Sequence, residues 1–507
     1  MAASTAVSMT GTGLHKLRRT LGVLLSGVAR AFPRSLRPTH NKEAHELHST
    51  AYLDALRGYA AWVVYNSHTV SSGWRSEGRA FMQLAIFQVL YKGHPMVHVF
   101  FVISGFALSY TMLRNMHRNQ PDKILDSLAS SIVRRHVRLY LPTIFATFIA
   151  MVCFSTGIAK KTEAPGVLES TYLGNLWHWI CETMRLIDPF PHVTTHWKVE
   201  AQGGHYLPQL WTIPVEFRGS MFLFLFCAAV CKMNARKRGY VTLATSVACF
   251  WYQTAYAGLF LFGMWLADRQ LGRAEHEQAK LTTLTTCVPD ADDSAFSRKL
   301  EHDLSEVEEA GIQVVTGESK WSDWTHFLRN EGRNPSALPT KFKFLRQLPY
   351  MILAYLGIIF LAAPDIITTD MRFPYNIGAM LMPPTYKDSW AAKNDWPQAI
   401  GALFLCYALE HSSLLRRPLE TPFSQFIGEL SFGIYAMHNT VRWIVWEQYF
   451  EPWTVRTFGE TRRDIWLILP GYFAMTFLVI WAAEGFRRVD MRCVDLARRM
   501  KDHLFAD

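Results

Sequence analysis

Apolar segments that are long enough, or nearly long enough, to cross a bilayer alternate with basic and mixed-charge stretches along this chain. A helix needs roughly 20 mainly apolar residues to span a membrane. Half of the residues are hydrophobic and only 19% are charged, which excludes a disordered chain and fits a single soluble domain poorly. Candidate spans lie near 51–70, 95–113, 139–158, 209–231, 240–253, 255–268, 347–364, 398–412, 424–449 and 464–485.

We therefore expect an all-α, polytopic membrane protein with about ten transmembrane helices and one long soluble loop. The clearest spans are Leu139–Ala159, Leu210–Cys231, Leu348–Ala363 and Ile465–Ala483, whereas 240–268 fits either two short spans or one long span. The expected parts are a basic cytosolic tail with an interfacial helix (1–50), helices one to six (51–268), a hydrophilic cytosolic loop (269–346), helices seven to ten (347–485) and a basic cytosolic tail (486–507).

The basic residues indicate which ends of the spans face the cytosol, because cytosolic loops are enriched in lysine and arginine. With both termini inside, the inner segments hold 36 basic residues and the outer loops hold 13. Without the long loop the inner count is still 25. This bias explains the net charge of +10 without nucleic acid, and it supports a cytosolic position for both termini. We expect a multi-pass protein of an endomembrane or the plasma membrane.

Ionisable side chains inside the expected spans are costly and therefore mark candidate functional sites. Arg57 and His68 are eleven residues apart, so they share one face of the first helix, about 16 Å apart along its axis. Asp54 lies one turn before Arg57 and can pair with it. A cation near the cytosol and a deeper imidazole suit an anionic cosubstrate. A snorkelling arginine and a packing histidine are the simpler alternatives.

Two further charged groups lie at the start of expected spans. Glu216, just inside the fourth span, should meet a cation, a hydroxyl or a substrate, because an unpaired carboxylate is expensive there. Arg218 is two residues away and faces the opposite side of the helix. The stretch before the third span forms either a phosphate clamp or a cytosolic anchor through Arg134, Arg135 and Arg138.

The ninth span carries polar residues at i, i+4, i+7 and i+11, which places them on one helix face. They are Ser431, Tyr435, His438 and Arg442. One polar stripe on an apolar helix indicates a site more specifically than any single histidine does. In the second span, the small pair Ser104-Gly105 favours close approach of another helix.

Four segments carry a resemblance to a known family. They are Leu53–Gly58 followed by His68, Phe100–Phe106, Leu210–Phe217, and Leu430–His438. In this order, on separate spans, they resemble the acyltransferase 3 family of integral-membrane O-acyltransferases, especially its eukaryotic, fungal-looking branch. One departure is His98, since many members carry an acidic residue there.

The resemblance implies transfer of an acyl group, usually acetyl, from acyl-CoA to a hydroxyl of a small metabolite or a glycan. It implies His68 as the base that activates the hydroxyl, Glu216 as an orienting group, and His438 or Tyr435 as a stabiliser of the oxyanion. The expected ligands of the CoA phosphates are Arg57, Arg134, Arg135 and Arg138. Neither a metal nor haem is expected.

Other classes of membrane protein share some of these features. Polar groups on several spans also describe the substrate pathway of a transporter, although no inverted repeat is evident. A haem protein that uses His68, His98 and His438 as axial ligands is a second alternative. The third is a scaffold whose charges only set its topology.

Overall fold

The computed structural model describes residues 48–69, 84–159, 171–188, 206–286, 340–364, 367–386, 390–459 and 465–505. Within these ranges every regular element is a helix and there is no strand, which confirms the all-α prediction for this part of the chain. The expected interfacial helix of the N-terminal tail and residues 287–339 of the long loop lie outside the described residues.

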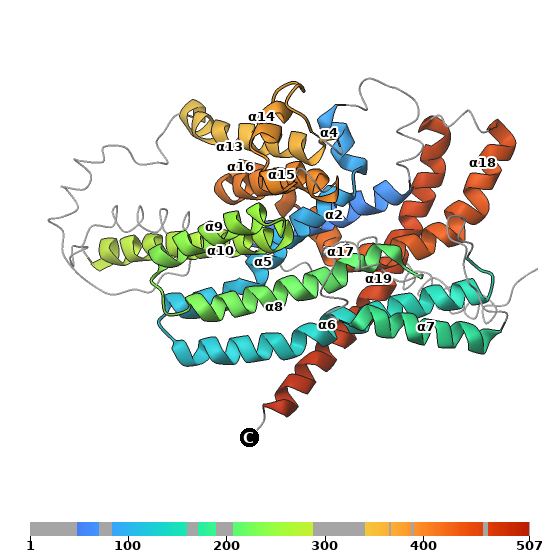
Figure 1. Ribbon diagram of the computed structural model, residues 1–507, viewed down its shortest axis with the longest axis horizontal. Coiled ribbons are helices and arrows are strands. Elements are labelled where there is room, and N and C mark those ends of the chain that lie inside the picture. Colours follow the sequence, from blue (N-terminus) through green and yellow to red (C-terminus); the bar gives the residue numbers. More distant parts are fainter. Residues whose placement is uncertain are drawn as a thin grey trace, which may run out of the picture.

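The helices form one assembly in which segments distant in sequence lie side by side (Figure 1). In chain order they are α2 (Ala51–Thr69), α4 (Ala85–Gln88), η3 (Val89–Tyr91), α5 (His94–His117), α6 (Pro121–Ser155), α7 (Tyr172–Ile187), η4 (Pro208–Trp211), α8 (Thr212–Val230), α9 (Ala235–Trp251), α10 (Ala255–Thr286), α13 (Thr340–Leu361), α14 (Tyr375–Met380), η6 (Pro384–Tyr386), α15 (Trp390–His411), α16 (Ser413–Arg416), η7 (Arg417–Glu420), α17 (Pro422–Val441), η8 (Arg442–Phe450), α18 (Glu451–Phe458) and α19 (Ile465–Leu504).

Four helical stretches of the described chain are long and apolar enough to cross a membrane. They are His94–His117, Asp122–Ser155, Pro208–Val230 and Leu469–Leu504. Three of them each contain most of one of the four spans that were clearest in the sequence. The fourth clear span falls on α13, whose apolar part, Leu345–Leu361, is shorter. The helices are therefore those of a membrane protein, and the full number of ten spans stays a prediction.

Small residues bring pairs of helices into close contact. A Cβ atom on Gly105 of α5 would collide with the backbone carbonyl of Phe260 on α10, and one on Gly263 would collide with that of Val102. On the other side of the assembly, a Cβ on Gly58 of α2 would lie 2.5 Å from the backbone nitrogen of Gly428 on α17. Close approach of this kind drives helix association in membranes. The packing role predicted for Gly105 is confirmed.

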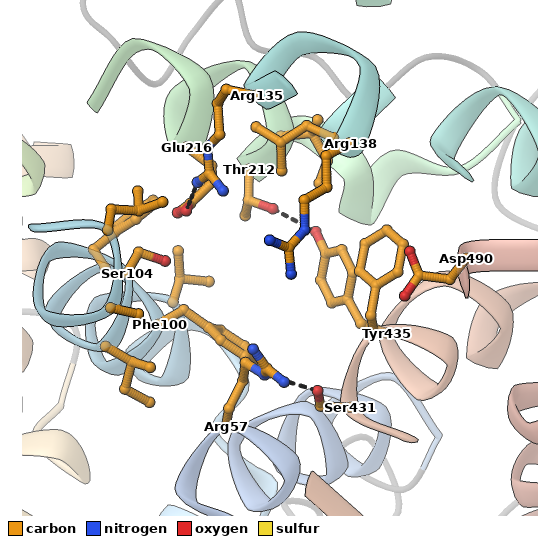
Figure 2. A pocket seen from close by; sticks show the side chains of 18 of the residues that line it. Arg57, Phe100, Ser104, Arg135, Arg138, Thr212, Glu216, Ser431, Tyr435 and Asp490 are labelled. Carbon is orange, nitrogen blue, oxygen red and sulfur yellow. Dashed lines mark hydrogen bonds and ion pairs between the residues drawn. The ribbon is translucent and has the colours of Figure 1, made fainter. Parts of the chain in front are cut away.

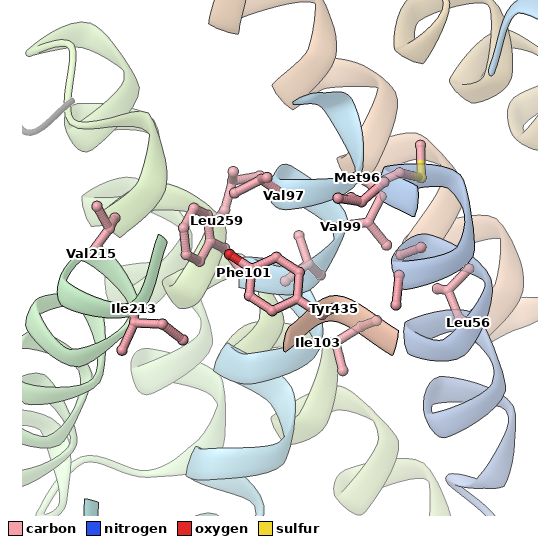
Figure 3. Close-up of a cluster of buried hydrophobic side chains, with 14 of the residues drawn as sticks. Leu56, Met96, Val97, Val99, Phe101, Ile103, Ile213, Val215, Leu259 and Tyr435 are labelled. Carbon is pink, nitrogen blue, oxygen red and sulfur yellow. The ribbon is translucent and has the colours of Figure 1, made fainter. Parts of the chain in front are cut away.

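A buried apolar cluster joins the central helices α2, α5, α8, α10 and α17 (Figure 3). Leu56, Val99, Phe101, Ile213 and Leu259 are all less than 10% exposed within it. This cluster fixes the five helices relative to one another. Polar side chains on the same helices are thereby held in defined positions.

The stretch 240–268 consists of two helices rather than one. The break lies at 252–254, between α9 and α10, where Gln253 adopts a φ of 60°. It does not lie at Gly258, which is inside α10 and packs closely on Phe250. Helix α10 then continues past the expected end of its span, as far as Thr286.

Two other helical segments were not expected from the apolar pattern. Helix α7 packs on α6, where the Trp179 indole donates a hydrogen bond to the Thr147 hydroxyl at 3.1 Å, and it leaves Leu173 and Trp177 exposed. Helix α19 does not end near residue 485 but runs for 40 residues to Leu504. The expected C-terminal tail is therefore mostly a continuation of the last helix.

Candidate active site

A cavity of about 320 Å³, here called the central cavity, lies between α2, α5, α6, α8, α17 and α19 (Figure 2). The guanidinium groups of three arginines point into it in Figure 2. Its charged lining residues are Arg57, Arg135, Arg138, Glu216, Glu429 and Asp490. Such a concentration of charge inside a helical membrane protein is rare without a ligand or a function.

Arg57 connects α2 to α17. Its Nε donates a hydrogen bond to the Ser431 hydroxyl at 2.9 Å, and its guanidinium pairs with Asp54 at 3.2 Å. The pairing with Asp54 predicted from their i, i+3 spacing is confirmed. Both charged side chains are about half exposed, at 42% and 57%, so this ion pair is weak. Arg57 is therefore available to an anion that enters the cavity.

Glu216 on α8 meets the cation that its position required. Its carboxylate forms an ion pair and a hydrogen bond with Arg135 of α6. Arg135 also donates a hydrogen bond from Nε to the Ser220 hydroxyl at 2.8 Å. The two charged side chains are only 10% and 14% exposed. Arg135 therefore compensates a buried carboxylate as well as facing the cavity.

Arg134 and Arg138 form no ion pair within the described chain. The Nε of Arg134 donates to the Ser130 carbonyl on its own helix, at 3.0 Å. Arg138 reaches into the central cavity, whose wall also contains Asp490 of α19 (Figure 2). Three of the four arginines predicted to bind phosphate thus lie in the central cavity, and Arg134 lies next to it.

Tyr435 of α17 stands in the wall between the central cavity and a second one. Its hydroxyl donates a hydrogen bond to the backbone carbonyl of Gln209 and lies 2.6 Å from the Thr212 hydroxyl. Tyr435, Thr212 and Val97 line both cavities. The proton of the Tyr435 hydroxyl is therefore already committed to a protein acceptor.

The second cavity, here called the histidine cavity, has a volume of about 270 Å³ and contains His68 in its wall. The His68 ring stacks on the His438 ring, with centroids 5.2 Å apart and planes at 27°. The Nδ1 of His438 lies 3.0 Å from the Ile434 carbonyl, which can only accept, so Nδ1 carries the proton. The buried Nε2 of neutral His438 is consequently an acceptor, with no hydrogen-bond partner among the described residues.

Gln209, in the short helix η4, was not singled out from the sequence. It is 4% exposed and lines the histidine cavity. Asn439 donates a hydrogen bond from its side chain to the Gln209 Oε1 at 2.6 Å, while Tyr435 holds the backbone carbonyl of the same residue. The Gln209 Nε2, a buried donor, has no hydrogen-bond partner in the described ranges. Buried donors usually have one, so this group is a candidate for contact with a ligand.

The opposite wall of the histidine cavity is built by α5 and α15. The Gln398 Oε1 lies 2.6 Å from the His94 Nδ1, and the Gln398 Nε2 donates to Asn394 at 2.7 Å. His98, where an acidic residue was expected for the family, is fully buried with its Nε2 3.6 Å from Asp395 of α15. A carboxylate is thus present beside this position, although it comes from another helix.

A third and larger cavity, of about 610 Å³, is here called the basic cavity. It lies between α5, α6 and the C-terminal half of α19, and shares Arg135 and Arg138 with the central cavity. Its cationic lining residues are Arg134, Arg135, Arg138, Arg498 and Lys501, and Asp126 is the one carboxylate among the described lining residues.

The structure thus places most of the predicted site residues at two adjoining cavities. His68, His438 and Tyr435 meet at or beside the histidine cavity, while Arg57 and Glu216 belong to the central cavity. Arg442, predicted on the face of His438, forms an ion pair with Glu447 at 2.8 Å. Within the described ranges, no group of three or more His, Cys, Asp or Glu side chains is placed to hold a metal ion.

Comparison with protein families gives a match to the acyltransferase domain over residues 50–288. This range contains α2 to α10, and therefore His68, Glu216 and the four predicted phosphate ligands. No solved structure matches the chain at a significant level.

Curated relatives extend the similarity over most of the chain. It is 28% identical to the O-acetyltransferase PaAT-1 of Phomopsis amygdali over 91% of this chain and 87% of that protein. It is 22% identical to the acyltransferase R4 of a Phoma species and to the acyltransferase clz18 of Cochliobolus lunatus, over 77% of this chain and 82% of each relative. The domain match over residues 50–288 and these relatives together support a transferase of acyl groups.

Proposed function

We propose that the protein is a multi-pass membrane O-acyltransferase that moves an acyl group, most simply acetyl, from acyl-CoA to a hydroxyl of a small metabolite or a carbohydrate. The observation that carries the proposal is the adjacency of two cavities with different chemistry. One is lined by arginines and the other by His68, and they share the wall of Val97, Thr212 and Tyr435.

The arginine-lined side suits the donor. CoA is a polyanion, and arginine binds phosphate through paired, charge-assisted hydrogen bonds. Arg57 and Arg138 are the strongest candidates, because neither is engaged in a buried ion pair. Arg135 shares its charge with Glu216, so we assign it mainly to holding that carboxylate. The pantetheine arm would lead the thioester from the arginines towards Tyr435.

The histidine cavity suits the hydroxyl acceptor. His68 would take the proton of the acceptor hydroxyl as its oxygen attacks the thioester carbonyl carbon. As the tetrahedral intermediate collapses, the carbon–sulfur bond breaks and the CoA thiolate leaves. The proton on His68 then passes to that thiolate, which restores the base. His438, stacked on His68 and offering an unpaired acceptor, would orient the base rather than donate to the oxyanion.

Gln209 supplies the donor that this chemistry needs. A tetrahedral intermediate carries its negative charge on oxygen, and a fixed N–H donor stabilises that charge. The Gln209 Nε2 is buried without a partner in the described residues, and Asn439 fixes the orientation of its amide. The Tyr435 hydroxyl is less suited, because it already donates to the Gln209 carbonyl. We therefore propose Gln209, not Tyr435, as the oxyanion donor.

A consistent membrane orientation supports this division of roles. We propose that α2, α5, α6, α8, α9, α10, α13, α15, α17 and α19 are the ten spans, with both termini cytosolic, in an endomembrane or the plasma membrane. Arg134 then lies in the cytosolic half of α6 and Arg138 at its middle, and acyl-CoA would enter from the cytosolic end. His68, His94 and Gln209 lie near the opposite ends of their helices.

The test uses purified protein in nanodiscs with radiolabelled acetyl-CoA and extracts of cells that lack the gene, followed by mass spectrometry for acetyl-sized mass differences. We expect an acetylated product from the wild type. His68→Ala should lower kcat by about 10²–10⁴-fold, since it removes the base. His503→Ala, an exposed histidine near the end of α19, is the matched control and should retain activity.

The same preparation tests the transporter alternative. If His68→Ala kept full transfer activity, the assigned chemistry would be wrong. If instead no acyl transfer were found and the variant lost movement of a solute across proteoliposome membranes, the protein would be a transporter.

A further inference from the structure

The basic cavity contains two cations that the proposed donor site does not use. Arg498 and Lys501 lie one turn apart on α19, beyond the acyltransferase domain match at residues 50–288, and they line the cavity together with Arg134 of α6. No sequence pattern singled them out, because they sit in a stretch of mixed charge.

These cations are available to a ligand. Arg498 pairs with Asp495 at 3.7 Å, and Lys501 with Asp502 at 2.9 Å. Both acidic side chains are about 60% exposed, so these ion pairs lie in water and contribute little. Arg134 has no ion pair in the described part of the chain. Among the described residues that line the cavity, Asp126 is the one carboxylate against five cations.

The cavity also carries hydrogen-bonding groups that suit a nucleotide. Its wall on α6 contains the hydroxyls of Ser127, Ser130 and Ser131, and its wall on α5 contains that of Thr111. It leads into the central cavity through the shared residues Arg135 and Arg138. A ligand with a phosphorylated head and a narrow arm would fill the two in sequence.

We propose that Arg498 and Lys501, together with Arg134, bind the 3′-phosphate on the ribose of CoA, so that the C-terminal helix selects CoA over its 3′-dephospho form. The proposal rests on the proposed function for the identity of the donor. The diphosphate of CoA would then lie deeper, at Arg138 and Arg57. A phosphate monoester adds up to two negative charges, and the positive charges of Arg498, Lys501 and Arg134 compensate them.

Binding separates this inference from catalysis. The affinities of CoA and 3′-dephospho-CoA are measured by calorimetry on the full chain in phosphatidylcholine nanodiscs. We expect the wild type to bind CoA at least about tenfold more tightly, because the extra phosphate makes charge-assisted hydrogen bonds. The double variant Arg498→Gln/Lys501→Gln should bring this ratio close to one while leaving the affinity for 3′-dephospho-CoA nearly unchanged.

The matched control removes the same charge from the same helix. Arg492 and Arg499 are exposed on α19 and do not line the basic cavity. The variant Arg492→Gln/Arg499→Gln should keep the wild-type ratio. Size-exclusion chromatography and thermal unfolding show whether each variant folds. A folded Arg498→Gln/Lys501→Gln protein with the wild-type ratio would overturn the proposal, as would a wild type that does not distinguish the two ligands.

Two further outcomes are informative. Phosphatidylserine in the nanodiscs offers a lipid phosphate as the competing source of the same chemistry. If it stabilised the protein through Arg498 and Lys501 while CoA was not distinguished, the cavity would be a lipid site and the proposal wrong. If CoA were selected through α19 but no acyl transfer occurred, the proposed function would fail while this binding site stood.

Discussion

The rings of His68 on α2 and His438 on α17 stack with their centroids 5.2 Å apart, although the residues are 370 positions apart in the chain. The Nδ1 of His438 is hydrogen-bonded to the Ile434 carbonyl, which fixes the orientation of the His438 ring. The stack restricts the orientation of the His68 ring before the reaction begins. Little further orientational entropy is then lost when His68 accepts a proton, which favours the transfer.

His438→Phe tests whether this stack has a chemical as well as a packing role. Phenylalanine keeps a flat ring against His68 but removes both ring nitrogens. We expect kcat to fall about tenfold or more with little change in KM for acyl-CoA, because substrate binding is not altered. Steady-state kinetics checks this. If His438→Phe kept the wild-type kcat, the stack would have only a packing role.

Gln209→Met removes the proposed oxyanion donor and keeps a side chain of similar length. Loss of one such donor typically costs about 10²–10³ in kcat. We expect a loss of this size with KM for acyl-CoA nearly unchanged. Gln398→Met, which removes another amide of the histidine cavity, serves as the control and should affect mainly KM for the acceptor. An equal loss of kcat in both variants would argue against a special role for Gln209.

Arg57→Gln and Arg138→Gln test the donor side of the central cavity. Each should raise KM for acyl-CoA about tenfold, the loss expected for one charge-assisted phosphate contact, while kcat changes little. Arg114→Gln removes a charge from α5 outside the central cavity and is the control. If KM stayed at the wild-type value in both cavity variants, the phosphates would bind elsewhere.

Removing one partner of the Arg135–Glu216 ion pair should lower the stability of the fold more than it lowers the catalytic rate. Both side chains are nearly buried, so removing one partner leaves an uncompensated charge, at a cost of about 3–5 kcal/mol. We expect Arg135→Met to unfold at a clearly lower temperature in detergent. The double variant Arg135→Met/Glu216→Met should recover part of that loss. A double variant less stable than both single ones would contradict this account.

Gly105→Val probes the contact between α5 and α10. The added side chain has no room against the Phe260 carbonyl, so the helices must separate, at a cost of about 1–3 kcal/mol or more. Gly485→Val on α19 is the matched control, because nothing lies within 4 Å of a Cβ at that position. Thermal unfolding of the purified proteins should show a loss of stability for the first variant only.

Periodicity and the cost of buried charge singled out several residues of the candidate site. The common face of Arg57 and His68 followed from helix geometry, and the need of Glu216 for a cation followed from its depth. The partner of Glu216 could not be predicted as Arg135 specifically, because the contact joins α6 and α8 through their packing. The stacking of His68 on His438 depends in the same way on how α2 meets α17.

Other features carry little signal in the sequence. In the sequence, Gln209 is an ordinary polar residue near the start of a span. Only its hydrogen bonds with Asn439 and Tyr435 distinguish it. Arg498 and Lys501 belong to a charged stretch that resembles any basic tail, so their place in a cavity depends on the continuation of α19. Helix α7 has 16 residues and an amphipathic pattern, and a search for long apolar runs passes over it.

The wall formed by Val97, Thr212 and Tyr435 has a kinetic consequence. In the proposed reaction the donor and the acceptor occupy different chambers, approached from opposite ends of the helices, and meet only at this wall. Neither substrate then obstructs the entry of the other, so no compulsory order of addition is required. Because His68 acts on an acceptor that is already bound, no acyl-enzyme need form, and the rate should depend on both substrates as in a ternary-complex mechanism.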